Sequence, residues 1–187
     1  MGGHHLVLGE LHDYLTGESR VDTHDERYRQ KIARLLVEVK GFGREMVTPR
    51  VPILIRAGGR RARVWIDLTV SLKGRTALLV KYAPGSLTTR HQVAIAASRL
   101  LGEEGQIPYS IVTNGEDADV LDNAGATVVA RGIDGIFTRQ ALEDRLVPRR
   151  NVPVTPRHRE MAARILYAYE VDGRCPCDDT VCDVDLS

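Results

Sequence analysis

The stretch ARVWIDLTV (residues 62–70) decides the fold, together with TALLVKY (76–82), which follows a turn at KGR (73–75). Both runs are rich in β-branched and aromatic residues, so they predict two adjacent antiparallel strands. A three-residue turn sets Asp67 opposite Lys81, and residues directly opposite each other share a face of the sheet. The sequence therefore predicts a carboxylate and an ammonium group side by side on one sheet face.

The rest of the chain supplies the elements of a mixed α/β sheet with helices on both faces. A capping box at Thr23–Glu26 begins a first helix that ends at Gly41, and a second helix runs from Thr88 or Thr89 to Gly102. We expect further strands at 51–56, 109–113 and 127–131, a short helix at 117–122, and helices at 138–146 and from Thr155 to about Tyr169.

We expect one folded domain with two tails, because 187 residues of which 43% are hydrophobic suffice for a single core. The predicted division is an N-terminal segment (1–22), a core (23–146), a linker with three prolines nearby (147–155), a C-terminal helix (156–170) and an acidic tail (171–187). The tail offers few apolar residues, so we expect it to pack little against the core.

Charge gives a local rather than a global signal for nucleic acid. The net charge is +1, but arginines gather at residues 44–63 and 139–164. We predict that Arg60, Arg61, Arg63 and Arg90 contact DNA phosphates, weakly and in a salt-sensitive way. No apolar run approaches the ~20 residues that cross a bilayer, and MGGHHLVLGE lacks a secretory pattern, so we expect a cytoplasmic protein without membrane contact.

All three cysteines lie in the tail, where Cys175, Cys177 and Cys182 form the pattern C-P-C-x4-C. A closed zinc site normally has four ligands, and an expected helix separates the nearest upstream imidazole, His158, from the cysteines. The pattern favours reduced thiols over a metal site. A metal or thiol protein, with a ligand from a partner or a second copy, is kept as an alternative.

The order of motifs resembles the N-terminal nuclease domain of the type I restriction enzyme R subunit. The motifs are DER-x-RQ (25–30), the strand with Asp67, the strand ending in Lys81, Gln92 in RHQVA, and PYSIVTNG (108–115). The resemblance covers about residues 23–136 and implies the αβββαβ core of the PD-(D/E)XK nuclease superfamily. It also implies DNA as the partner and Mg²⁺ as the cofactor of an active enzyme.

The resemblance further implies roles for individual residues. In that family the aspartate and the acidic residue of the (D/E)XK triplet bind Mg²⁺, the lysine orients or activates water, and the glutamine supports the site. By position, these roles fall to Asp67, Lys81 and Gln92, and the family's helix-one glutamate corresponds to Glu26, a second metal ligand. The place of the acidic triplet residue is occupied by Leu79.

Leu79 leaves two classes of function open, because one carboxylate holds Mg²⁺ poorly. The first is a Mg²⁺-dependent DNA endonuclease in which Glu26 or Glu38 supplies the missing carboxylate. The second is a catalytically silent module that binds nucleic acid, a protein partner or a second copy of itself. In the second case Asp67 and Lys81 form a structural ion pair, and Glu26 only caps its helix.

Overall fold

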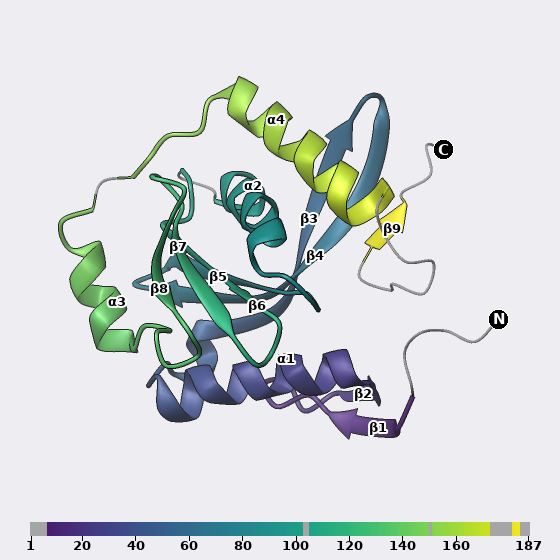
Figure 1. Ribbon diagram of the computed structural model, residues 1–187, viewed down its shortest axis with the longest axis vertical. Coiled ribbons are helices and arrows are strands. Elements are labelled where there is room, and N and C mark those ends of the chain that lie inside the picture. Colours follow the sequence, from purple (N-terminus) through teal and green to yellow (C-terminus); the bar gives the residue numbers. More distant parts are fainter. Residues whose placement is uncertain (1–6, 103–104, 150, 173–180, 184–187) are drawn as a thin grey trace.

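The computed structural model describes residues 7–102, 105–149, 151–172 and 181–183. Residues 181–183 are described by their backbone alone. A mixed seven-stranded sheet lies between two groups of helices (Figure 1). Helices α1 (His24–Arg34) and α3 (Arg139–Leu146) pack in one apolar core, and helices α2 (His91–Leu101) and α4 (Pro156–Leu166) pack in the other. The predicted α/β class, with helices on both faces of a mixed sheet, is therefore confirmed.

Helices α1 and α4 begin at the predicted caps, Thr23 and Thr155. The predicted cap of α2 at Thr88 or Thr89 is wrong, because both residues lie in a 3-10 turn and the N-cap of α2 is Arg90, without a side-chain cap bond. Thr23 Oγ1 accepts a hydrogen bond from the backbone N–H of Glu26, and Thr155 Oγ1 accepts one from His158. The helices are α1 (His24–Arg34), continued by a π-helical turn (Leu35–Val39); a 3-10 turn (Arg44–Met46); α2 (His91–Leu101), preceded by a 3-10 turn (Thr88–Arg90); α3 (Arg139–Leu146); and α4 (Pro156–Leu166), continued by a π-helical turn (Tyr167–Asp172). None of them is long and apolar enough to span a membrane within the described ranges.

The sheet runs in the order β3-β4-β5-β6-β7-β8, and β9 pairs with β4. All neighbours are antiparallel except β5 and β6, which α2 connects by a crossover. A separate hairpin of short polar strands, which we did not predict, precedes α1. The strands are β1 (Gly9–His12), β2 (Ser19–Asp22), β3 (Val47–Ala57), β4 (Arg60–Leu72), β5 (Arg75–Tyr82), β6 (Tyr109–Thr113), β7 (Ala118–Asp122), β8 (Thr127–Arg131) and β9 (Val181–Asp183).

The predicted turn length between β4 and β5 is wrong, but the predicted register is right. Leu72 pairs with Arg75, so the turn has two residues instead of three. A β-bulge after Val70 shifts the register by one residue, and beyond it Leu68 lies opposite Val80. Continued by one residue, the same register would set Asp67 opposite Lys81, but the two side chains bind different partners, Arg29 of α1 and Glu170 after α4. The turn is one residue shorter than predicted and the bulge adds one residue, so the two deviations cancel in the register.

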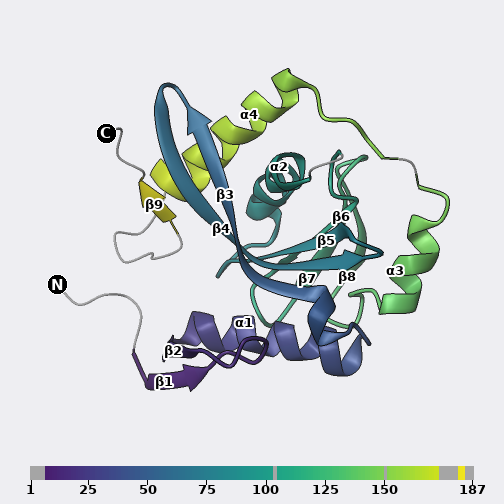
Figure 2. The same cartoon turned by 180° about the vertical axis from the view of Figure 1, so that it is seen from behind.

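Strands β3 and β4 bend at Asp67. Ile66 packs with α2 and α4, whereas Leu68, two residues later, packs with α1. In a straight strand these side chains share a face, so the strand changes direction between them. Arg50, across from Asp67 in β3, has a positive φ of 52°. Beyond the bend the two strands form an arm that runs beside α4 (Figure 2).

The segment at 117–122 is strand β7 rather than the predicted short helix. Asn114 Oδ1 accepts hydrogen bonds from the backbone N–H groups of Glu116 and Asp117, which closes a turn between β6 and β7. Val120 and Leu121 are buried in the two cores across a bulge. The segment is short, so its apolar pattern fits a helix or a strand equally well. The turn at Asn114 favours the strand, because it brings the segment alongside β6.

The expectation that the tail packs little is wrong for the part of it that the structure describes. The π-helical turn after α4 buries Val171, which is 7% exposed, against α2 and α4. The backbone of β9 pairs with residues 62–64 of β4, beyond the end of β5. Cys175 and Cys177 lie outside the described residues, and Cys182 is described by its backbone alone.

Candidate active site

Helix α1 presents three polar side chains to the bend of β4. Glu26, Arg29 and Gln30 are three and four residues apart, so they share one face of the helix. The Asp67 carboxylate accepts a hydrogen bond from Arg29 Nε at 2.6 Å and another from the backbone N–H of Tyr82 at 2.8 Å. Asp67 is only 9% exposed, so both of its oxygens are bound by protein groups away from bulk water.

Glu26 lies in the same cluster and does more than cap its helix. Its carboxylate accepts hydrogen bonds from Gln30 Nε2 at 2.8 Å and from Arg50 Nη2 at 2.5 Å. Arg29 Nη1 lies 3.5 Å from the same carboxylate. Thr23 performs the capping, so the Glu26 side chain is available to the site.

Arg29 occupies the space between the two carboxylates. Glu26, Arg29, Arg50 and Asp67 line a cavity of about 10 Å3, close to the least volume that admits one water molecule. Among the residues that the structure describes, no three His, Cys, Asp or Glu side chains are grouped to hold a metal. Glu26 and Asp67 remain the predicted metal ligands, and a cation could join them only if Arg29 moved.

Burial and charge act in opposite directions on Arg29. Burial lowers the pKa of its guanidinium, but the charge of Asp67 and the hydrogen bond to it outweigh burial and raise the pKa above its ordinary value. Arg29 is therefore a fixed positive charge at every physiological pH.

Lys81 points its amine at a residue that the sequence did not single out. Its Nζ lies 2.6 Å from Glu170 Oε2, and both side chains are 6% exposed. Arg90 Nη1 lies 3.7 Å from the other oxygen of Glu170. Burial lowers the pKa of Lys81, but Glu170 first and Asp67 second outweigh it and leave the pKa raised. Lys81 is thus a charged group that cannot accept a proton.

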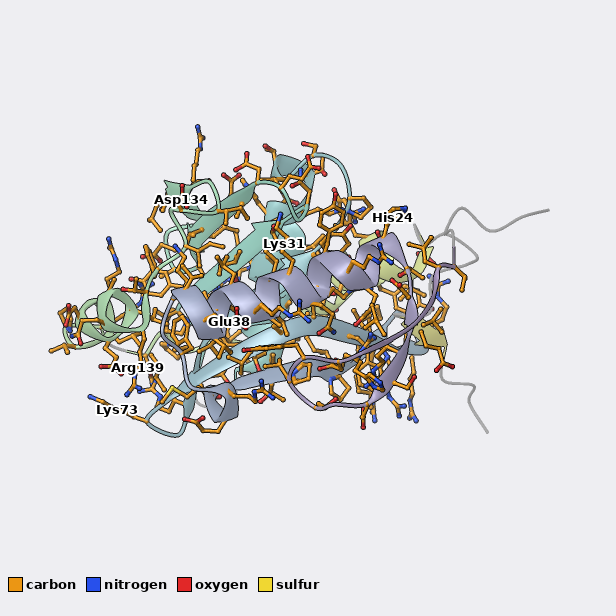
Figure 3. All side chains as sticks on the ribbon, turned by 90° about the horizontal axis from the view of Figure 1, so that it is seen from below. His24, Lys31, Glu38, Lys73, Asp134 and Arg139 are labelled. Atoms are coloured by element: carbon orange, nitrogen blue, oxygen red, sulfur yellow. The ribbon has the colours of Figure 1, made fainter. Side chains whose placement is uncertain are left out.

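The other residues discussed for catalysis lie apart from this cluster. Leu79 is fully buried in the core with α2, so an apolar contact fills the place of the missing carboxylate. Glu38 is exposed about 18 Å along the helix from Glu26, well away from His24 in Figure 3, and cannot replace it. Gln92 is exposed on the first turn of α2, and none of the described hydrogen bonds or ion pairs joins it to Asp67, Lys81 or Glu26.

The four arginines predicted to contact DNA fall into two pairs. Arg60 lies over the ring of Tyr167, 4.3 Å from its centroid, and its guanidinium is 3.2 Å from the Asp172 carboxylate. Arg90 approaches Glu170, so both arginines contact the turn after α4. Arg61 and Arg63 instead lie on the exposed face of the β3–β4 arm.

Sequence reasoning missed Arg29, Arg50 and Glu170. Arg29 could have been found, because it stands three residues after Glu26 in the DER-x-RQ motif and helical spacing puts both on one face. Arg50 depends on the register of β3 against β4, and Glu170 depends on the path of α4 across the molecule. Neither of these has a local sequence signal.

The ion pairs join four cations and three carboxylates. The cations are Arg29, Arg50, Lys81 and Arg90, and the carboxylates are Glu26, Asp67 and Glu170. Asp13, which lines the same cavity, and Asp25, whose charge helps to raise the pKa of Arg29, add two carboxylates, so these side chains carry no excess of positive charge.

Comparison with known proteins places the chain in a family. A sequence model of the type I restriction enzyme R protein N terminus matches residues 24–136. That span begins with α1 and extends past β8, so it contains Asp67 and Lys81 but not Glu170. No curated protein matches the chain, and no solved structure matches it.

Proposed function

Because the chain belongs to the family of the type I restriction enzyme R protein N terminus, we propose that it is a DNA-binding protein on a PD-(D/E)XK nuclease scaffold whose catalytic centre is closed by ion pairs. The observation that supports this most directly is the bond between Arg29 and Asp67, where a guanidinium stands at the carboxylate that would bind Mg²⁺. DNA binding without Mg²⁺-dependent cleavage is the expected behaviour.

The charges of the cluster oppose a divalent cation. Mg²⁺ requires a near-octahedral set of oxygen ligands at about 2.0–2.1 Å. Arg29 interacts with both nearby carboxylates, and Arg50 holds Glu26 as well. A bound Mg²⁺ would have to expel Arg29 and compete with Arg50 for Glu26.

Lys81 cannot compensate for an absent metal. Its ammonium group is buried and held by Glu170, so it neither takes a proton from water nor reaches a water fixed by a cation. Without a positioned nucleophile, the proximity that drives phosphodiester hydrolysis is missing.

The surface proposed for DNA is the outer face of the β3–β4 arm. Cross-strand pairs bring Arg56 opposite Arg61 and Leu54 opposite Arg63, and Trp65 follows on the same face. The three arginines are exposed, and Arg63 lies 6.0 Å from the centre of the Trp65 ring. Guanidinium groups bind phosphate oxygens, while Trp65 and Leu54 offer apolar contact to sugar or base. We call these five residues the arm face.

Binding of a labelled duplex, followed by fluorescence anisotropy at 50 and 200 mM salt, tests this proposal. Affinity should fall steeply with salt, because each neutralised phosphate releases counterions. The double variant Arg61→Ala with Arg63→Ala should weaken binding by about tenfold. Its affinity should also fall less steeply with salt, by the slope that corresponds to roughly two phosphate contacts. Arg139→Ala with Arg164→Ala, which removes two exposed arginines from α3 and α4, is the matched control. Equal affinity in the arm variant and the control would contradict the arm face as the DNA site.

A Mg²⁺-dependent endonuclease is the second candidate, and one observation favours it. Glu26 and Asp67 line the same cavity, so movement of Arg29 alone would leave two carboxylates around one space. This candidate requires DNA or Mg²⁺ to displace Arg29, which a cleavage assay detects.

A further inference from the structure

We propose that Lys81 and Arg90 form an anion site that the Glu170 carboxylate fills in this structure and for which a DNA phosphate competes. The inference rests on the proposed DNA binding, and it adds an internal competitor for the DNA. The competitor is the π-helical turn Tyr167–Asp172 that follows α4, which we call the latch segment.

The geometry at Glu170 is that of a bound anion. One carboxylate oxygen is 2.6 Å from Lys81 Nζ, and the other is 3.7 Å from Arg90 Nη1. Lysine and arginine bind carboxylates and phosphates through the same charge-assisted hydrogen bonds. Lys81 is almost fully buried under the latch segment, whereas Arg90 is 31% exposed, so an anion from outside would reach Arg90 first.

A second contact of the latch segment points to the same competitor. Arg60 lies over Tyr167 and pairs with Asp172, so two of the four arginines predicted to contact DNA interact with this segment. Asp172 and Glu170 are both acidic, and both meet cations that are suited to phosphate. The latch segment therefore covers the basic groups that lie between the arm and the start of α2.

Release of Glu170 is physically accessible. The Arg60–Asp172 pair is exposed on both sides, and pairs of this kind contribute little to stability in water. The buried Lys81–Glu170 pair gains attraction but has lost the hydration of both ions, so a phosphate that supplies equal attraction can replace the carboxylate. Tyr167 and Val171 stay anchored in the core, so the exchange involves the Glu170 side chain and the last turn of the segment.

The variant Glu170→Gln tests the competition by anisotropy with a labelled duplex. We expect it to bind DNA about five- to tenfold more tightly than the wild-type chain. Glu160→Gln is the matched control, because it removes the same charge from an exposed position on α4. Adding Lys81→Met to Glu170→Gln should abolish the gain. A Glu170→Gln affinity no higher than that of Glu160→Gln would overturn the inference, while wild-type binding that depends on Arg61 and Arg63 would leave the proposed function standing.

Hydrogen exchange on the wild-type chain keeps the test decisive if Glu170→Gln folds poorly. Saturating duplex DNA should speed exchange of the amides of residues 170–172, the last turn of the latch segment, because a phosphate releases the Glu170 side chain. Unchanged or slower exchange there would overturn the inference. Mg²⁺-dependent cleavage by the wild-type chain that is lost in Glu170→Gln would overturn the inference too, since Glu170 would then replace the acidic residue whose place Leu79 occupies.

Discussion

Arg29 Nε lies 2.6 Å from Asp67 Oδ1, and this bond joins helix α1 to the point where strand β4 bends. The same guanidinium lies 3.5 Å from Glu26, so one side chain interacts with both carboxylates from which a cation site could be built. Both carboxylates are buried, and a buried charge without a partner is costly. Arg29 therefore stabilises the fold and closes the site at once.

Removal of Arg29 should open the site to a divalent cation. Arg29→Met leaves Glu26 and Asp67 without their shared partner, and we expect a loss of roughly 3–5 kcal/mol in the free energy of unfolding. Mg²⁺ or Mn²⁺ at millimolar concentration should then raise the melting temperature of the variant by several degrees, because the ion binds only the folded state.

The control for this experiment is Arg27→Met, on the same helix, where the arginine pairs with Asp22 outside the cluster. Neither Arg27→Met nor the wild-type chain should respond to the metal. A melting temperature of Arg29→Met that Mg²⁺ and Mn²⁺ leave unchanged would show that Glu26 and Asp67 form no cation site.

Leu79→Glu should destabilise the protein rather than complete an active site. Leu79 is fully buried among α2 side chains, so a carboxylate there would lose its hydration without a partner in the core. We expect the free energy of unfolding, measured by urea denaturation, to fall by several kcal/mol. Leu79→Met, of similar volume, should cost less than about 1.5 kcal/mol. Equal stability of the two variants would mean that the side chain at 79 reaches solvent.

Strand alternation predicts the register of β4 against β5 near Asp67 and Lys81, but the register agrees only because a bulge that the sequence does not signal offsets a turn one residue shorter than predicted. The bend at Asp67 was not predictable from the sequence. Ile66 and Leu68 are both apolar, so the alternation of apolar and polar residues looks the same in a straight strand, where both side chains pack in one core, and in a bent strand, where each packs in a different core. β7 was predicted as a helix because its five residues fit the apolar spacing of a helix as well as that of a strand. Glu170 contacts Lys81 across almost half the chain, through the packing of α4, which no local pattern encodes.

The Lys81–Glu170 pair should contribute to stability over a defined range of pH. The folded state raises the pKa of Lys81, so the stabilisation is complete below the unfolded-state value of about 10.4 and is lost as pH rises through the folded-state pKa. The difference in unfolding free energy between the wild-type chain and Lys81→Met should be constant from pH 7 to 9 and shrink above about pH 10.4.

Lys73→Gln, in the exposed turn between β4 and β5, is the control for the loss of a lysine charge. Its difference from the wild-type chain should be small across the whole range. A difference for Lys81→Met that grows between pH 7 and 9 would mean that burial, rather than Glu170, sets the pKa of Lys81, because a lowered folded-state pKa makes stability rise with pH.

Cleavage of plasmid and linear duplex DNA by the wild-type chain and by Asp67→Ala, with Mg²⁺ and with Mn²⁺, tests the central claim most directly. If ion pairs close the centre, the two proteins should show the same background level of cleavage with either metal, while the wild-type chain still binds the duplex. Metal-dependent cleavage by the wild-type chain that disappears in Asp67→Ala would contradict the account and show that Arg29 yields its place to a cation.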